Sequence, residues 1–308
     1  MMRPEFAMIG VLIGSIVLAA AVQSGRPRPE PVLTDPESVD YGFSLSPDGR
    51  QVFYTHANPE RTERHLYRAE MRAGQIVNAS PLLLDGKTVP GGDVQIAPDG
   101  ERLVFYSRDL PAGGVRTPDG DIFMAHREAN GWSVPLALPA QINTRHDEYY
   151  PVLTDSGNLY FSRNLPGTGY DIFVARWIDG AWQDAERLPG AINTGLLESD
   201  AYIAPDESFM IFVRMDGSDG LGSSDLYISC RDDGIWSAAV NLGRAFNFEG
   251  VDGSPFVTAD REWLYYTSNR TSADPAAFDS HLGIYRIRLG PDRIERLCAA
   301  ARTSSAIR

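Results

Sequence analysis

Residues 97–143 decide the fold, and they read APDGERLVFYSRDLPAGGVRTPDGDIFMAHREANGWSVPLALPAQIN. The stretch opens on a Pro-Asp-Gly turn, continues into an aromatic strand, and reaches Asp121-Ile122-Phe123 after a loop rich in Gly and Pro. Trp132 follows eleven residues after Asp121, and Asn143 follows eleven residues after Trp132. Short apolar strands between turn residues are typical of antiparallel β-structure.

The same landmarks recur along the chain. Two further copies with both gaps of eleven are Asp171, Trp182 and Asn193, then Asp225, Trp236 and Asn247. The turn recurs as well, and its aspartates are Asp48, Asp99, Asp155, Asp206 and Asp260. Spacings of 51, 56, 51 and 54 residues between them define five repeats.

Each repeat predicts four short antiparallel strands. We therefore expect an all-β protein, a β-propeller with five blades, over residues 38–297. The repeats are expected near 38–90, 91–144, 145–196, 197–249 and 250–297, with a linker at 22–37 and a C-terminal tail at 298–308. A sixth, degenerate blade is the alternative, if residues 31–35 combine with a C-terminal strand at 293–298.

The turn Ser46-Pro47-Asp48-Gly49, with the aromatic strand and the Asp-Ile-Phe motif that follow in the repeats, carries a family resemblance. It resembles the WD-like (SPDG) repeat of TolB-type β-propellers, over nearly the whole chain after residue 37. The pattern is also similar to the propellers of prolyl oligopeptidase-type enzymes. The resemblance to TolB implies a periplasmic protein that captures a protein or peptide with its loop face.

Charge and the N-terminal segment predict an exported acidic protein. Lys+Arg 28 against Asp+Glu 41 gives a net charge of −13, which repels phosphate backbones and argues against general nucleic-acid binding. Arg3 precedes an apolar run at residues 7–22 that ends in Ala19-Ala20-Ala21. This pattern predicts a signal peptide over residues 1–21 and a periplasmic or secreted location. The alternative is an uncleaved anchor, in which case the membrane is contacted through this segment alone.

The chain has few residues that could form disulfides or bind metal ions as thiolate or imidazole ligands. Cys230 and Cys298 fall in different repeats, so we expect them to stay unpaired, with a disulfide as the alternative. The five histidines show no ligand spacing. No cofactor and no metal site are predicted from these residues, and a metal ion held by acidic residues at the channel mouth stays an alternative.

The repeated landmarks are first expected to be structural. Trp132, Trp182 and Trp236 share one register, which predicts packing between adjacent blades rather than a stacking platform for a sugar or peptide. The turn aspartates are expected to accept hydrogen bonds from their own backbone amides. Asp121, Asp171 and Asp225 open the third strand of their repeats and are expected to fix the loop before it.

A second set of charged residues predicts a binding site at the channel mouth. Eight residues before each turn aspartate stand Asp40, Gly91, Asp147, Glu198 and Asp252, with Asp93, Glu148 and Asp200 close by. Arg108, Arg163, Arg214 and Arg270 end the second strands on the same face. The candidate anchors for a ligand are Asp147, Glu148, Asp200, Asp252, Arg163 and Arg214. The alternative, which we favour, is that these acids and arginines tie neighbouring blades together.

The loops between second and third strands differ most between repeats, at residues 111–120, 164–170, 215–224 and 271–281. Variable loops on a uniform scaffold are where binding specificity resides, so we expect the partner to dock there. The predicted function is a non-catalytic, monomeric β-propeller that binds an envelope protein or peptide. The alternative is a carbohydrate-active hydrolase that uses channel-mouth carboxylates. A prolyl oligopeptidase-type activity is excluded because the chain has no G-x-S-x-G motif.

Overall fold

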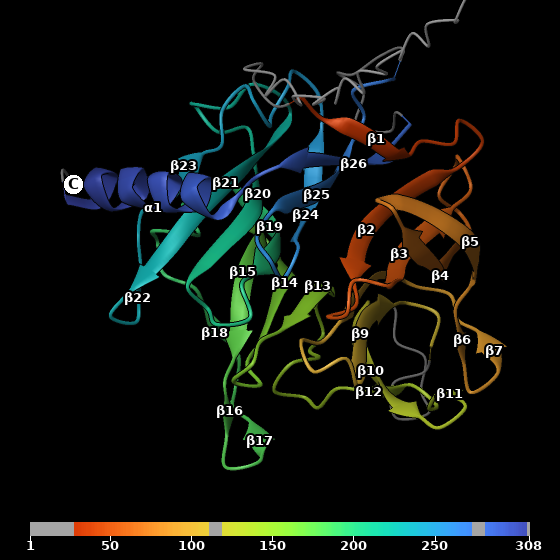
Figure 1. Ribbon diagram of the computed structural model, residues 1–308. Coiled ribbons are helices and arrows are strands. Elements are labelled where there is room, and N and C mark those ends of the chain that lie inside the picture. Colours follow the sequence, from red (N-terminus) through yellow and green to blue (C-terminus); the bar gives the residue numbers. More distant parts are fainter. Residues whose placement is uncertain (1–27, 111–118, 273–280, 307–308) are drawn as a thin grey trace, which may run out of the picture.

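The computed structural model describes residues 28–110, 119–272 and 281–306. Within them, five antiparallel sheets stand around a central axis as a five-bladed β-propeller, which confirms the predicted fold (Figure 1). The predicted signal peptide lies outside the described residues. In the part of the chain that the structure describes, no helix is long and apolar enough to cross a membrane.

The three inner strands of every blade follow the repeat. The innermost strands are β2 (Val39–Leu45), β8 (Gly92–Ile96), β13 (Glu148–Leu153), β19 (Leu197–Ile203) and β24 (Asp252–Val257). The second strands are β3 (Gln51–Ala57), β9 (Arg102–Ser107), β14 (Leu159–Leu165), β20 (Phe209–Met215) and β25 (Trp263–Ser268). The third strands are β4 (Arg64–Arg72), β10 (Asp121–Glu128), β15 (Gly169–Ala175), β21 (Ser224–Asp232) and β26 (Gly283–Arg288).

The outer edges of the blades are shorter and less regular. The outer strands of the first four blades are β5 (Gln75–Pro81), β11 (Gly131–Trp132) with β12 (Leu136–Ala137), β18 (Glu186–Arg187), and β22 (Ile235–Trp236) with β23 (Val240–Asn241). Two small hairpins are β6 (Leu83–Leu84) with β7 (Lys87–Thr88), and β16 (Trp177–Ile178) with β17 (Ala181–Trp182). The β16–β17 hairpin reverses through Asp179 and Gly180, both left-handed, as an Asp-Gly turn requires.

The N-terminal part of the chain closes the ring. β1 (Glu30–Leu33) pairs antiparallel with β26 and is the outer strand of the fifth blade. The side chain of Arg286 reinforces this pairing with an ion pair to Glu30. The prediction of a linker was therefore wrong for residues 30–33, and the alternative of a sixth blade was wrong as well. Four residues are too short a strand for the sequence pattern to reveal.

The C-terminal segment is a helix, α1 (Pro291–Ala306), so the predicted strand at residues 293–298 was wrong. Ile294, Cys298 and Ala301 are buried, and their spacing of four and three places them on one helical face. That face packs against β21 and β23 of the fourth blade, beside which α1 extends outward (Figure 1). A disulfide joins Cys298 to Cys230 in β21, against the expectation of unpaired thiols. The sequence could not show the pairing because the helix returns the chain from the fifth blade to the fourth.

The repeated tryptophans lie at the junctions between blades. Trp132 of the second blade lies edge-on to Phe53 of the first blade, with ring centroids 6.1 Å apart. Trp236 of the fourth blade meets Tyr160 of the third in the same way, at 6.5 Å. Trp182 pairs with Trp177 within its own blade and is half-buried, and it packs against the apolar cluster that residues of the second and third blades form together. The prediction of inter-blade packing is confirmed for the first two, and Trp182 lies at the edge of such a cluster.

The repeated polar residues stabilise the connections. The side chain of Asn193 accepts a hydrogen bond from the N–H of Ile172 and donates to the carbonyl of the same residue, and Asn143 and Asn247 do the same in their blades. The turn aspartates that cap their own backbone amides, as predicted, are Asp48, Asp99, Asp206 and Asp260.

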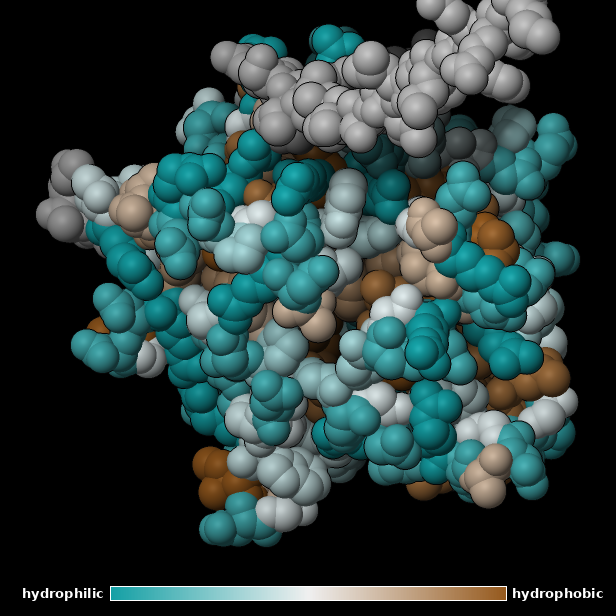
Figure 2. All heavy atoms as spheres, viewed as in Figure 1, coloured by the Kyte–Doolittle hydropathy of each residue, from teal (hydrophilic) through white to brown (hydrophobic). Residues whose placement is uncertain are grey.

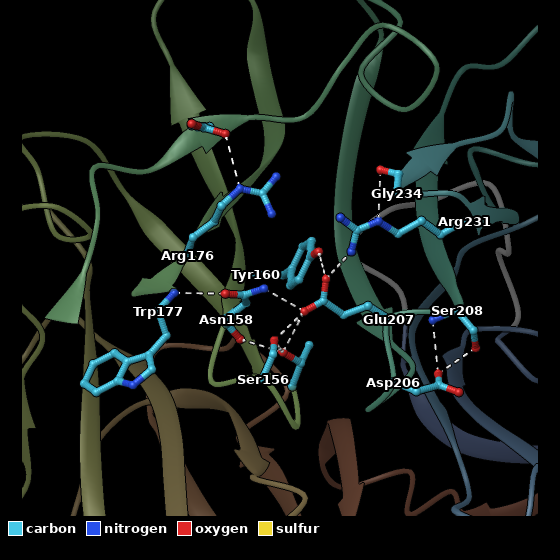
Figure 3. A network of polar contacts seen from close by, with 12 residues as sticks. Ser156, Asn158, Tyr160, Arg176, Trp177, Asp206, Glu207, Ser208, Arg231 and Gly234 are labelled. Carbon is cyan, nitrogen blue, oxygen red and sulfur yellow. Dashed lines mark hydrogen bonds and ion pairs between the residues drawn. The ribbon is translucent and has the colours of Figure 1, made fainter. Parts of the chain in front are cut away.

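Glu207 joins the turns of two blades. It occupies the left-handed position of its turn, with φ of 57°, where the second repeat has Gly100. Its buried carboxylate accepts hydrogen bonds from Thr154, Ser156, Asn158 and Tyr160 of the third blade and from Arg231 of its own blade (Figure 3). Burial raises the pKa of this carboxyl, but the hydrogen bonds outweigh burial and leave the pKa below its ordinary value. A departure from the turn consensus thus stabilises the junction of the third and fourth blades.

The face seen in Figure 2 is predominantly hydrophilic, as the net charge of −13 leads one to expect. Apolar side chains gather there in small groups, one of them at the tip of the β16–β17 hairpin. Ile178 in this hairpin is 49% exposed.

Candidate functional site

A bulge interrupts the innermost strand of every blade. At each bulge the pairing with the second strand shifts register, and one residue takes the left-handed conformation. We call these five residues the bulge ring, and they are Gly42, Asp93, Tyr150, Asp200 and Ser254. Left-handed backbone is unfavourable for side chains other than glycine, so the surrounding contacts must hold the ring in place.

Hydrogen bonds between neighbouring blades hold the bulge ring. The N–H of Asp93 donates to Oγ1 of Thr55 in the first blade at 2.9 Å, and the N–H of Asp200 donates to Oγ of Ser162 in the third blade at 3.1 Å. Each carboxylate in turn accepts a hydrogen bond from the next blade. The carboxylate of Asp93 accepts the N–H of Tyr150. Asp93 and Asp200 are therefore fixed in position before any ligand arrives.

The carboxylate of Asp200 makes the corresponding contacts with the fifth blade. It accepts the N–H of Ser254, and Oγ of Ser254 donates to its Oδ2 at 3.1 Å. Asp93 and Asp200 thus use their carboxylates in the same way at two junctions of the ring.

A pocket of about 320 Å³ opens above the bulge ring, and we call it the loop-side pocket. Asp93, Asp200 and Asp147 supply its acidic groups, and Arg61, Arg64 and Arg108 its basic groups. Four tyrosines complete much of its wall, namely Tyr41, Tyr106, Tyr149 and Tyr170. A small pocket with few convergent polar groups and aromatic walls is the form that ligand sites take.

The pocket also contains a hydroxyl that lacks a partner. Oγ1 of Thr267 is buried and has no hydrogen-bond partner among the described residues. The residue is 3% exposed and lines the loop-side pocket. A buried polar group without a partner is costly unless a ligand or water bonds it.

The two deep carboxyls have raised pKa values. Burial, with added repulsion from Asp200, raises the pKa of Asp93 to about 8. Burial also raises the pKa of Asp200 to about 6, and hydrogen bonds from Ser254 and Ser199 limit that rise. At neutral pH the pair therefore holds a proton that two exposed aspartates would have lost. Such displaced pairs of carboxyls cluster at functional sites.

Most of the predicted anchors lie outside the loop-side pocket. Glu148 and Asp252 are fully buried and Arg163 and Arg214 nearly so. Nε of Arg163 donates to Oε1 of Glu148 at 2.7 Å, while its Nη2 donates to the carbonyl of Ile142 in the connection from the second blade at 2.8 Å. The geometry is that of the alternative interpretation, in which these residues tie neighbouring blades together.

The same arrangement recurs in the next two blades. Arg214 bonds Glu198 and the carbonyl of Ile192. Arg270 bonds Asp252 and the carbonyl of Phe246. Each arginine also lies over aromatic rings of its own blade, as Arg214 does over Tyr227 at 4.5 Å. Burial raises the pKa of Asp252 to about 6 although Arg270 opposes the rise.

Asp147 and Asp200 are the two predicted anchors that do line the loop-side pocket. Asp147 is held at the rim, where Nη2 of Arg108 donates to its Oδ2 at 2.7 Å and the N–H of Gly120 donates to its Oδ1 at 2.7 Å. The variable loops meet the pocket at their ends, through Tyr170 and Met215. Loop residues 111–118 and 273–280 lie outside the described residues.

The aspartates that open the third strands serve different contacts. The side chain of Asp225 accepts hydrogen bonds from the N–H of Leu221 and from Asn241, so it fixes the loop before β21 as predicted. Asp171 accepts a bidentate pair of hydrogen bonds from Arg187 in β18 and so joins the third and fourth strands instead. Asp121 is buried at the start of β10.

The predicted anchors did not include Asp93, Tyr41, Arg64 or Tyr149, all of which line the pocket. Arg64 donates to the hydroxyl of Tyr41, so both side chains are oriented within the pocket. A signal was present in the sequence, since only two of the five repeats have an acid at the bulge position. Departure from the repeat consensus, rather than agreement with it, marks the site. Among the described residues no cluster of His, Cys, Asp and Glu forms a metal site.

No family model and no curated protein matches the sequence. Solved structures do match in fold. One is the catalytic domain of an α-L-arabinofuranosidase from Coprinopsis cinerea, with a TM-score of 0.55 and 12% identity over 85% of this chain and 96% of that one. Another is a TolB-type protein from Agrobacterium tumefaciens, with a TM-score of 0.51 and 14% identity over 82% of this chain and 81% of that one.

TolB from Acinetobacter baumannii is a further match, with a TM-score of 0.48 and 12% identity over 82% of this chain. The match spans 54% of that protein, about half of its length. At identities this low the likeness shows a shared fold and nothing about activity. The chain is thus a five-bladed β-propeller whose structural neighbours include both TolB proteins and a glycoside hydrolase.

Proposed function

We propose that the protein is an exported binding propeller that takes a basic side chain of a peptide or protein partner into the loop-side pocket. One observation carries the proposal. Glu148, Glu198 and Asp252 each have an arginine partner, whereas Asp93 and Asp200 have no ion pair within the described residues. A ligand amine would supply the counter-charge that this buried pair lacks, and it would favour loss of the proton that the pair holds.

The remaining lining suits a segment of peptide. The face of a tyrosine ring attracts a cation through its ring electrons. Tyr149 and Tyr170 both line the pocket, and their ring centroids are 5.2 Å apart. Arg108 is neutralised by Asp147, while Arg64 is held by Tyr41 and suits a carbonyl or carboxylate of the same segment. A pocket of about 320 Å³ admits one side chain rather than a folded domain. The variable loops around it would contact the rest of the partner.

The disulfide supports an exported location. Disulfides persist in oxidising compartments such as the periplasm and are rare in the cytosol of mesophiles. The Cys230–Cys298 bond therefore agrees with the predicted signal peptide and with a partner in the cell envelope.

A pull-down from envelope extract tests the proposal. The bait is the disulfide-bonded protein, and the variant is Asp93→Asn with Asp200→Asn, which keeps the shape and one acceptor oxygen on each side chain. The matched control is Asp179→Asn with Asp233→Asn, which removes two exposed charges in hairpin turns where Asn is equally suited. Partner recovery with the wild type and the control but not with the variant supports the proposal. Equal recovery with all three refutes it.

A second candidate is a glycoside hydrolase. The displaced pKa values of Asp93 and Asp200 would provide a proton donor and a base in one pocket at neutral pH. A panel of nitrophenyl glycosides tests this candidate. Turnover that disappears in both Asp93→Asn and Asp200→Asn would favour the hydrolase over the binding protein, and no turnover by the wild type would remove it.

A further inference from the structure

The opposite mouth of the channel holds a second cavity, which we call the turn-side pocket. It has a volume of about 510 Å³ and takes residues from all five blades, at the ends of the innermost strands and in the turns that follow them. The side chain of Tyr150 lines neither this pocket nor the loop-side pocket. This buried side chain reaches from the third blade to the fifth, where its hydroxyl donates to the carbonyl of Pro255 at 3.1 Å.

The wall of the turn-side pocket is mainly apolar. Its apolar residues include Ile96, Val152, Leu153, Ile203, Phe256 and Val257. Prolines of the repeated turn add to it, such as Pro98 and Pro205. Ligand sites are of this size and are lined largely by apolar side chains with a few polar groups that set orientation.

Gln95 is a polar residue of this wall. On the innermost strands it stands where three other blades have Val152, Tyr202 and Phe256, and where the first blade has Ser44, as their pairing with the second strands shows. The residue is 4% exposed, lines the pocket, and its Nε2 has no hydrogen-bond partner among the described residues. A buried amide without a partner is unfavourable, and an acceptor atom inside the pocket would satisfy it.

The rim of the turn-side pocket is negative. Asp48, Asp155 and Asp260 line it, and none of the three has an ion pair within the described part of the chain. The corresponding turn aspartates of the second and fourth blades, Asp99 and Asp206, are paired with arginines. The rim therefore disfavours anions.

We propose that the turn-side pocket is a second binding site, for a small apolar molecule that carries a hydrogen-bond acceptor oxygen and no negative charge. The apolar body fills the wall, the oxygen accepts from Nε2 of Gln95, and the acidic rim rejects anionic compounds. The site is independent of the amine site proposed for the loop-side pocket.

Three probes of similar shape test the chemistry. Acetophenone has an apolar body and one acceptor oxygen, ethylbenzene lacks the oxygen, and benzoate adds a negative charge. Binding to the disulfide-bonded protein is followed by methyl NMR. Val152 and Val257 report on the turn-side pocket, and Val213 and Val251 report on the loop-side pocket. We expect acetophenone to shift the first pair only, to bind roughly tenfold more tightly than ethylbenzene, and benzoate not to bind.

Variants separate the contributions. Gln95→Leu should make acetophenone and ethylbenzene bind equally, and this ratio does not depend on the stability of the variant as long as it is folded. Asp155→Asn with Asp260→Asn removes two of the three rim charges and leaves residue 260 an acceptor oxygen for its turn, and this variant should admit benzoate. Asp93→Asn with Asp200→Asn should leave acetophenone binding unchanged.

Four results would overturn the proposal. They are no binding of acetophenone to the wild type, equal binding of acetophenone and ethylbenzene, shifts at Val213 and Val251, or benzoate binding as tightly as acetophenone. If Gln95→Leu fails to fold, the comparison of acetophenone and ethylbenzene on the wild type and the benzoate test on the rim variant still decide it.

Discussion

Nε of Arg163 lies 2.7 Å from Oε1 of Glu148, and this ion pair joins the second strand of the third blade to its innermost strand. Both side chains are buried, and Glu148 also accepts hydrogen bonds from the backbone and hydroxyl of Thr144. The pair therefore anchors the connection that arrives from the second blade. Acids on the innermost strands divide into those with such a partner and those without one.

Glu148→Gln should destabilise the protein by about 3–5 kcal/mol, because Arg163 is then buried without a counter-charge. The free energy of unfolding in urea measures this change. The control is Glu186→Gln, which breaks the exposed pair with Arg176 and should cost less than about 1 kcal/mol. If Glu148→Gln leaves stability unchanged but weakens partner binding, Glu148 belongs to the functional site after all.

Glu207→Gly restores the glycine that other repeats have in this turn. The substitution removes the cost of a left-handed backbone at a residue other than glycine, which is about 1–2 kcal/mol. It also removes five hydrogen bonds, one of them from the charged Arg231. We expect a net loss of about 2–4 kcal/mol, since charge-assisted bonds outweigh the strain.

The control for Glu207→Gly is Arg261→Gly at the same position of the fifth repeat, where φ is 59°. Its ion pair with Asp206 is half-exposed, so this variant should lie within about 1 kcal/mol of the wild type. Equal effects of the two glycine substitutions in urea unfolding would show that the Glu207 network contributes nothing specific.

Replacing both cysteines by alanine should cost about 4 kcal/mol, because the disulfide closes a loop of 68 residues in the unfolded chain. Thermal unfolding of the variant and of the wild type with reductant measures the loss, and the two should agree. Reaction of the denatured, unreduced wild type with a thiol reagent should find no free cysteine. Two reactive thiols would contradict the pairing.

Stability should depend on pH through the bulge ring. The pKa of Asp200 is raised to about 6 and that of Asp93 to about 8, above the value of 3.8 for an unperturbed aspartate. Between about pH 4 and pH 8 the folded state therefore binds more protons than the unfolded state, so the free energy of unfolding falls as pH rises. Asp93→Asn with Asp200→Asn removes this contribution. The advantage of the variant over the wild type should grow from pH 5 to pH 8, and parallel pH profiles would contradict the pKa shifts.

The repeats made the fold predictable because each blade must bury the same strand faces. The regular gaps from Asp121 to Trp132 and Asn143 reflect one set of backbone contacts repeated around a ring. The closing strand Glu30–Leu33 and the helix α1 were not predicted, because neither is repeated in the sequence. Both are stabilised by tertiary packing, which the sequence pattern does not show.

The candidate site was only partly predictable. Acids that recur in register, such as Glu148 and Asp252, are conspicuous in the sequence, yet their recurrence reflects a shared structural contact. Asp93 and Asp200 differ from the residues at the same position of the other repeats, but the bulge that orients them and their neighbours from adjacent blades are visible only in the structure. Whether a carboxylate meets an arginine or an open pocket is decided by the side chain opposite it.

Binding of N-acetyl-lysine methylamide tests the central claim most directly. The compound is titrated into the protein by calorimetry at pH 7 and pH 8.5, with N-acetyl-norleucine methylamide as the uncharged analogue. The account predicts that the lysine derivative alone binds and binds more tightly at pH 8.5, where Asp93 is ionised. Asp93→Asn with Asp200→Asn should weaken binding at least tenfold, while Asp179→Asn with Asp233→Asn should not. Equal affinity for the norleucine analogue, or full binding by the Asp93 and Asp200 variant, would contradict the claim that these two carboxylates receive a basic group.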